Sequence, residues 1–242
     1  SSWWNPFSWM EPPSWWNPFS WFGETEFDPD ELEDARIEIH EMYQKRGYLD
    51  AAVEIPKVET AGDGSLQIAI GVTEGIAYHF GNMTLSGITV FPESELRNIL
   101  KQRMKSGDLA TLTTIEATAQ ALRDYYGSRG YINATVNPVK KPVAAEGGTD
   151  GTLDVQFVFT EGAPVKIRNI LIRGNSKTKD KVIRRELQVY PGEIFNEVRV
   201  RHSQMVLMNL GYFADVRAIP LPTRDPSAND LLLEVEEKQT GM

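Results

Sequence analysis

The fold is decided by a stretch that occurs three times: RGYLDAAVEIPKV at 46–58, RGYINATVNPVKK at 129–141 and LGYFADVRAIPLP at 210–222. The shared tyrosines, Tyr48, Tyr131 and Tyr212, are 83 and 81 residues apart. Two further landmarks recur at a similar interval, because VTEG and FTEG end 87 residues apart and LSG is followed by IRG. This periodicity predicts a tandem array of modules of ~80–87 residues.

The middle copy predicts the order strand, helix, helix, strand, strand. A strand-like run ends at LSG, a helix begins at Pro92, and Thr113 with Glu116 suggests a capping box for a second helix. The last strand alternates regularly, with Leu153, Val155, Phe157 and Phe159 on one face. We therefore predict an α+β fold in which each module is a three-stranded mixed sheet covered by two helices.

Three domains follow from these landmarks. We place a partial module at 1–75, a complete module at 76–162 and another complete module at 163–239. The first lacks the leading strand and first helix of the other two, so we expect the chain to begin inside it.

Prolines predict which strand lies at the edge of each sheet. Pro56, Pro138 and Pro220 follow the three tyrosines by eight, seven and eight residues, in the middle strand of each module. A proline cannot donate to a ladder on both sides, so it favours an edge. The first strand returns through a helical crossover, which predicts the order first, third, second.

The composition excludes several classes of protein. A net charge of −9 argues against a nucleic-acid partner, and the absence of cysteine excludes disulfides and thiolate metal sites. No apolar run approaches the ~20 residues that span a bilayer, and the first residues lack the features of a signal peptide.

No catalytic motif is present. His40, His79 and His202 are each isolated, and none of the familiar zinc, hydrolase, dinucleotide or phosphate-loop patterns occurs. We predict no enzyme activity, no metal and no cofactor, although an unrecognised hydrolase site is an alternative that only an activity screen would reveal.

The module resembles the POTRA domain, through its β-α-α-β-β order, the glycine before the helices and the GY after them. The third copy, with IRGNSKTKDKVIRREL, PGEIFN and LGYFADV, resembles the last periplasmic module of BamA-type outer-membrane protein assembly factors. In that family the stretch equivalent to Lys238, Thr240 and Gly241 leads into a membrane β-barrel. The three copies would then be the end of the third module, the fourth and the fifth.

The resemblance implies a periplasmic scaffold in a diderm bacterium whose partners are unfolded outer-membrane proteins, accessory assembly lipoproteins and its own C-terminal β-barrel. Clients would add a strand to the exposed edges. The predicted client-binding residues are Ala51, Val53, Ile55, Asn133, Thr135, Asn137, Asp215, Arg217 and Ile219. The alternatives are the receptor arm of a secretion pore and a cell-envelope division scaffold without a barrel.

Two apolar features suggest partner docking. The octamer SWWNPFSW occurs at 2–9 and again at 14–21 and holds all six tryptophans. The family carries WWN in an inter-helix loop, so Trp15 and Trp16 either pack on their own module or face a partner. Met205 and Met208 lie off the apolar stripe of their helix, which favours a binding surface for them.

Overall fold

The computed structural model describes residues 29–60, 66–144 and 150–238. These residues fall into two compact units, one made of 29–39 with 53–60 and 66–71, the other of 40–52 with the described part of 72–238. None of the helices in the described ranges is both long and apolar enough to cross a membrane.

The N-terminal elements are one helix and four short strands. They are α1 (Pro29–Lys45), β1 (Ala52–Val53), β2 (Lys57–Thr60), β3 (Leu66–Ala69) and β4 (Val72–Thr73). β2 and β3 form an antiparallel hairpin, and β1 pairs with β4. The sequence suggested two continuous strands here, and the structure interrupts both. Pro56 lies in the first interruption, where its missing N–H cannot continue a ladder.

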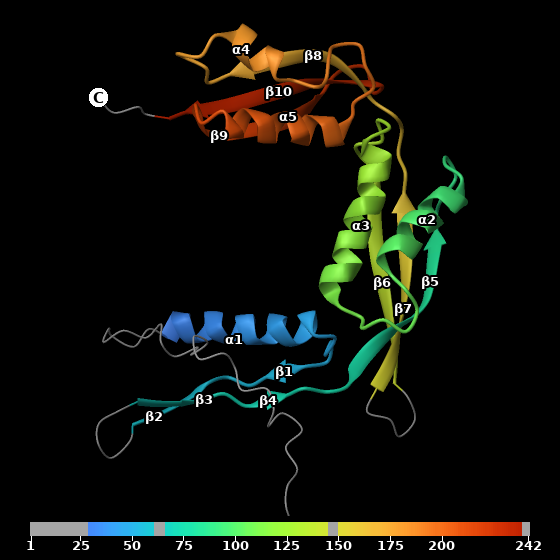
Figure 1. The fold of residues 1–242 in the computed structure, drawn as a ribbon, viewed down its shortest axis with the longest axis vertical. Helices are drawn as coiled ribbons and strands as arrows, with labels where there is room; N and C mark the ends of the chain where they lie inside the picture. The colour runs from blue at the N-terminus through green and yellow to red at the C-terminus, as the bar shows by residue number, and fades with distance from the viewer. Residues whose placement is uncertain (1–28, 61–65, 145–149, 239–242) are drawn as a thin grey trace, which may run out of the picture. The chain divides into compact units, whose positions relative to one another are not determined.

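The middle module has the predicted order of elements: β5 (Ala77–Ser86), α2 (Glu93–Arg103), α3 (Leu112–Gly127), β6 (Thr135–Ala144) and β7 (Asp150–Thr160). Its sheet has the order β5-β7-β6, with β5 parallel and β6 antiparallel to β7 (Figure 1). The third strand is central and the second is at the edge, so the predicted strand order is confirmed.

The core of this module lies between the sheet and its two helices. Leu153, Val155, Phe157 and Phe159 are all buried, as the alternation predicted. They pack with buried side chains of both helices, among them Leu96, Leu100, Ile115, Leu122 and Tyr126. Alternation with period two on β7 thus meets helical stripes on α2 and α3.

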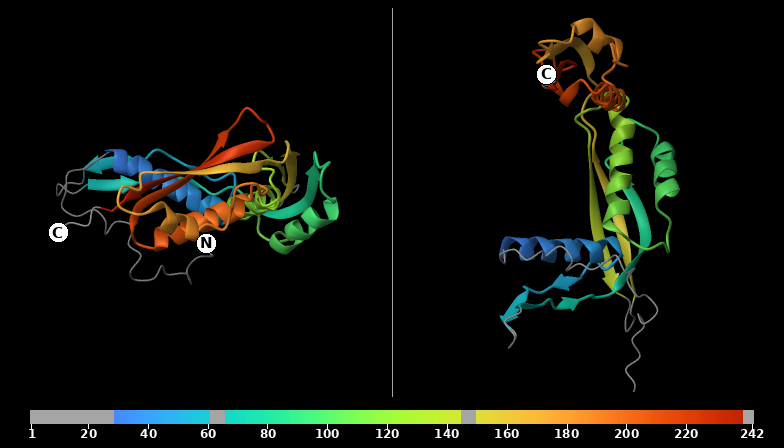
Figure 2. Two further views of the ribbon diagram at one scale, coloured as in Figure 1. Left: turned by 90° about the horizontal axis from the view of Figure 1, so that it is seen from above. Right: turned by 60° about the vertical axis from the view of Figure 1, so that its left-hand side comes forward.

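The last module repeats this architecture with β8 (Lys166–Arg173), α4 (Asp180–Arg185), α5 (Glu197–Asn209), β9 (Phe213–Pro222) and β10 (Ala228–Glu237). The sheet order is β8-β10-β9, so β9 is again the edge, and Figure 2 shows the same elements from two further directions. Its separate core includes Ile167, Ile183, Leu207, Phe213 and Leu233. The predicted fold class, an α+β array of mixed three-stranded sheets, is confirmed by these two modules.

Candidate functional site

The second strand of each complete module has one side without a neighbouring strand. β6 pairs only with β7, and β9 only with β10, within the described residues. Alternate residues of an antiparallel edge strand turn their N–H and C=O groups toward the neighbour, and the others turn them outward. Which residues face outward decides where another chain can pair.

Two glycines fix these directions. Gly87 follows β5 with φ +81°, and a Cβ on it would strike the carbonyl oxygen of Phe159. The main-chain groups of Phe159 therefore face β5, and its partner on β6, Val136, turns its own groups outward. In the last module Gly174 lies against the carbonyl of Val235 in the same way, so Val216 on β9 faces outward.

The prolines agree with this assignment. Counting by twos from Val136 and Val216 reaches every proline of the two strands, namely Pro138, Pro142, Pro220 and Pro222. Each one therefore sits where the sheet requires no donor. The same positions remove donors from the free edges, which is a common protection of edge strands against unwanted pairing.

The predicted client-binding residues of the middle module lie at the start of this edge. Asn133 precedes β6, in the turn before the strand, and its side chain is exposed. Thr135 and Asn137 are on β6 with exposed side chains, but their main-chain groups face β7. Their side chains border the edge, and the outward main-chain groups belong to Val136, Pro138, Lys140, Pro142 and Ala144.

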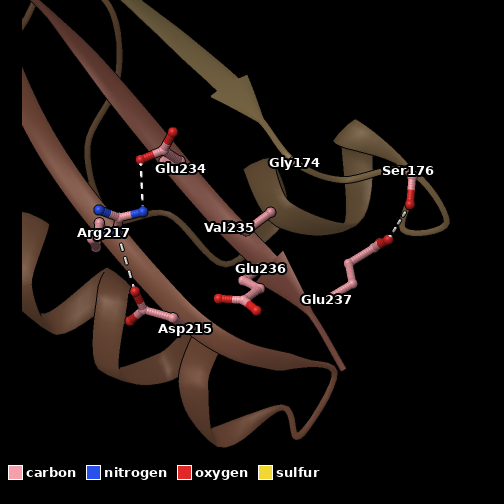
Figure 3. A pocket seen from close by; sticks show the side chains of 8 residues that line it. All are labelled: Gly174, Ser176, Asp215, Arg217, Glu234, Val235, Glu236 and Glu237. Carbon is pink, nitrogen blue, oxygen red and sulfur yellow. Dashed lines mark hydrogen bonds and ion pairs between the residues drawn. The ribbon is translucent and has the colours of Figure 1, made fainter. Parts of the chain in front are cut away.

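In the last module, Asp215, Arg217 and Ile219 likewise alternate with the outward-facing residues of β9. Figure 3 shows Arg217 between two carboxylates, Asp215 at 3.2 Å and Glu234 at 3.0 Å. The guanidinium is thus already paired within its own sheet. Any client contact by Arg217 would compete with these two ion pairs.

The predicted residues of the first module differ in exposure. The side chains of Ala51 and Val53 are buried, at 4% and 8% exposure, whereas Ile55 is 78% exposed. Ile55 lies in the interruption between β1 and β2. Of the three, only Ile55 offers a side chain to a client.

A hollow of about 370 Å³ lies at the end of the last sheet, lined in part by Arg217, Glu234 and Glu237 (Figure 3). The Glu237 carboxylate accepts from Ser176 Oγ at 2.7 Å and from the Lys177 and Thr178 amides at 2.9 and 2.6 Å. These bonds, that of Ser176 foremost, lower the pKa of Glu237 from 4.5 to about 2. Within the hollow Arg217 is paired with Asp215 and Glu234, and Glu237 closes a turn.

Glu161 has the matching place in the middle module. It accepts from the amides of Thr89 and Val90, in the turn after β5, and from the Tyr126 hydroxyl at 2.6 Å. Burial opposes its ionisation, but hydrogen bonds from Thr89 and Tyr126 outweigh burial and lower its pKa. In the sequence this glutamate stands out only as part of the repeated TEG. In both copies the glutamate accepts a tyrosine hydroxyl from the preceding helix, Glu74 from Tyr43 and Glu161 from Tyr126.

The partner-docking prediction concerned Trp15, Trp16, Met205 and Met208. Trp15 and Trp16 lie outside the described residues. Met205 and Met208 lie on α5 and are 57% and 38% exposed. Within the described parts of the chain, no group of three His, Asp or Glu side chains could hold a metal ion.

The two methionines occupy a position that forms an interface in the preceding module. Counting back from the glycine of the GY pair, they match Asp124 and Gly127 on α3. Asp124 pairs with Arg201 of the last module, and Gly127 lies against Glu197. The last module therefore exposes apolar side chains where the middle module contacts its successor.

Comparison with known proteins identifies a matching family and two similar proteins. The profile described as POTRA, surface antigen variable number repeat, matches residues 78–162 and 165–238. A putative outer membrane protein assembly factor of Treponema pallidum is 31% identical over 89% of this chain and 26% of its own length. The outer membrane protein assembly factor BamA of Nitratidesulfovibrio vulgaris is 31% identical over 81% of this chain and 24% of its own.

A solved structure has the same fold. The crystal structure of Haemophilus influenzae BamA POTRA3-5 superposes with a TM-score of 0.72 at 24% identity, over 88% of this chain and 83% of that one. The chain spans about a quarter of the length of the relatives named above.

Proposed function

This chain belongs to the POTRA family, and on that premise we propose that it is the periplasmic scaffold of an outer-membrane protein assembly factor. Domains of this family act as non-enzymatic scaffolds. The proposal is supported by the assembly factors that resemble the chain over most of its length. Such an assembly factor would also have a C-terminal β-barrel as a partner of its modules, and the modules would divide at 1–75, 76–162 and 163–239.

The observation that carries the proposed activity is the pair of free edges on β6 and β9. An unfolded outer-membrane protein has extended segments with unpaired main-chain groups, and adding such a segment to a sheet edge satisfies them. Main-chain pairing requires no particular side chain, so clients of many sequences can be accepted. The few outward donors keep this pairing weak, which suits a scaffold that must release its client.

We further propose that Met205 and Met208 dock an accessory subunit with an apolar contact surface. Methionine adapts to irregular apolar partners, and the equivalent positions on α3 already form an interface within this chain. Trp15 and Trp16 are proposed as a second apolar docking element. The occupant of the methionine surface is expected to lack a basic residue at the place of Arg201, because Met205 replaces the acidic Asp124.

The client-binding proposal is tested by following the binding of an urea-unfolded outer-membrane β-barrel protein, diluted into buffer, to the 242-residue chain. Lys140→Pro combined with Ala218→Pro removes an outward donor from each edge. The control is Lys101→Ala on α2, away from both edges. We expect the edge variant to bind the client more weakly and the control to bind it normally.

An unfolded soluble helical protein serves as the second comparison. Equal binding of both unfolded proteins, or unchanged binding by the edge variant, would overturn strand addition as the activity.

A further inference from the structure

The first outward carbonyl of each edge is bonded to a side chain of the preceding helix. In the middle module Arg123 Nη1 donates to the carbonyl of Val136 at 3.2 Å, and in the last module Gln204 Nε2 donates to that of Val216 at 2.5 Å. In the first module Arg36 Nη1 donates to the carbonyl of Val53 at 3.4 Å. We call this contact the edge-carbonyl bond.

The three carbonyls are equivalent, but their donors are not all equivalent. Val53, Val136 and Val216 follow the GY tyrosines by five, five and four residues. Arg123 and Gln204 precede their carbonyls by 13 and 12 residues, whereas Arg36 precedes its own by 17, one helical turn further. Donors from two helix positions thus reach the same carbonyl, so the bond follows from the edge and not from one helix residue.

Neighbouring side chains hold two of the donors in place. Arg123 also donates to the Gln120 side-chain oxygen, at 2.8 Å from Nη2 and 3.2 Å from Nε. Arg36 has the corresponding partner three residues earlier, Glu33, at 2.9 Å from Nε. A guanidinium fixed by a second acceptor loses less freedom when it binds the carbonyl.

Because the Val136 carbonyl is occupied, the outward residues of β6 differ in which main-chain groups they leave free. Val136 retains its N–H, and Pro138 and Pro142 have carbonyls but no N–H. Lys140, in the middle of the strand, offers both groups, and Ala144 offers both at its last residue. On β9, the Val216 N–H is also taken, by the Asp215 carboxylate at 2.9 Å, which leaves Ala218 with the one outward donor before the two prolines.

We propose that the edge-carbonyl bond of Arg123 closes the start of the β6 edge and centres an added client strand on Lys140. This inference rests on the proposed function, since it specifies where that function's strand addition takes place. Arg123 is then a positioning residue that limits how far the client pairs toward Thr135. β6 has more free outward N–H groups than β9, and this difference makes β6 the preferred edge.

The side chains around Lys140 describe the segment that fits. Val139 and Val143 are 40% and 54% exposed, on the face of β6 away from the helices, and Lys140 is exposed on the other face. Cross-strand pairs favour apolar against apolar and opposite charges against each other. The geometry thus fits an extended segment with an acidic residue opposite Lys140 and apolar residues opposite Val139 and Val143.

The probe is a synthetic ten-residue peptide of valine and threonine with a central glutamate, and its control has the same composition in shuffled order. Amide shifts of the ¹⁵N-labelled 242-residue chain are followed by nuclear magnetic resonance. We expect the largest shift at Lys140, with Val136 affected less and the β9 amides least. Largest shifts at Asn133 to Asn137 would overturn the assignment of Lys140 as the centre.

Two substitutions test Arg123 itself. Arg123→Met keeps the length of the side chain but removes the donor, which frees the Val136 carbonyl. The affinity for the peptide should then rise about two- to tenfold, the effect of one net hydrogen bond. Arg123→Gln introduces the side chain that makes this bond on β9 and should bind like the parent. Arg97→Met on α2 removes a charge away from the edge and should also leave affinity unchanged.

The outcomes separate this inference from the proposed function. If the peptide binds at the edge but Arg123→Met and Arg123→Gln behave alike, strand addition stands and the role of Arg123 is overturned. If the probe binds Arg123→Met and not the parent chain, Arg123 closes the whole edge and the centring of the client on Lys140 is overturned. If the probe binds no variant, both the inference and strand addition on β6 fail.

Discussion

Tyr126 donates its phenolic hydroxyl to Glu161 at 2.6 Å inside the middle module, joining the end of α3 to the end of the central strand β7. Tyr126 is fully buried and Glu161 is 8% exposed. Burial, followed by the bond to Glu161, raises the pKa of Tyr126. The glutamate also holds the turn after β5, so one carboxylate connects the helix, the central strand and the crossover.

The first prediction concerns this bond. Tyr126→Phe removes the hydroxyl and leaves a buried carboxylate one donor short, which should lower the free energy of unfolding by about 1–3 kcal/mol. Tyr125→Phe is the matched control, since the adjacent hydroxyl bonds Glu95 in an exposed setting and should matter less. Urea denaturation followed by circular dichroism measures both. Equal losses for the two variants would contradict a special role for Glu161.

The second prediction is the dependence of stability on acid. The folded-state pKa of Glu161 lies below its ordinary value, and that of Glu237 falls from 4.5 to about 2. A carboxyl whose pKa is lowered by folding stabilises the fold above its unfolded pKa, and that contribution disappears as the pH falls through the folded value. Stability should therefore decline between about pH 4.5 and pH 2.

Glu161→Gln and Glu237→Gln should each make the acid decline shallower, because the substituted side chain no longer titrates. Chemical denaturation at pH 6, 4 and 3 measures the slope. Glu186→Gln is the control, because among the described residues that carboxylate pairs only with exposed Arg185. A slope that neither turn-closing glutamate changes would show that acid acts elsewhere.

Part of this molecule could be predicted from its sequence because the periodic signals were long. Alternation on β7 and the proline positions led to the correct core face and strand order. Other details could not be predicted, because neighbouring residues could fill the same role. Thr113 was the predicted helix cap, but the helix begins at Leu112 and the side chain of Thr111 accepts the Thr114 amide. The two threonines offer the same chemistry, so the sequence alone does not choose between them.

The outward direction of the edge residues is encoded locally only by the prolines, because Pro138 and Pro142 on β6 lie where the sheet requires no donor. The alternation of side chains on β6 shows which residues face the core, but the direction of the main-chain groups depends on register with β7. The close approach of Gly87 to Phe159 shows which main-chain groups of β7 face β5, and the register then shows which groups of β6 face outward. Thr135 therefore looked like an edge position from sequence, while its main-chain groups face the sheet.

The third prediction concerns the junction of the two complete modules. Gly130 has φ +94° and accepts the Val165 amide at 2.9 Å, and a Cβ on it would lie 2.7 Å from Ile194. Gly130→Ala should cost ~1–2 kcal/mol through backbone strain and should also displace the Ile194 contact. Gly211→Ala has a similar φ of +77° in open space, so it controls for strain alone.

Small-angle scattering and amide shifts of Val165 and Ile194 distinguish these effects. We expect Gly130→Ala to broaden the distribution of distances between modules and Gly211→Ala to leave it unchanged. Identical profiles for both variants would show that the glycine contact does not restrict the junction.

The last prediction tests the direction of the β6 main chain with two neighbouring lysines. Lys140 is an outward position, whereas Lys141 is paired with Asp154 in the ladder to β7. Lys140→Pro should change the free energy of unfolding little, because its N–H is not used by the sheet. Lys141→Pro removes a ladder donor and should destabilise the module by about 1–3 kcal/mol. The residue types, exposure and loss of charge are matched, so urea denaturation isolates the direction of one amide. Hydrogen exchange gives the same answer without substitution, since the Lys140 amide should exchange rapidly and the Lys141 amide slowly. A protected Lys140 amide together with a destabilised Lys140→Pro would show that the outward residues have been assigned to the wrong side of the strand.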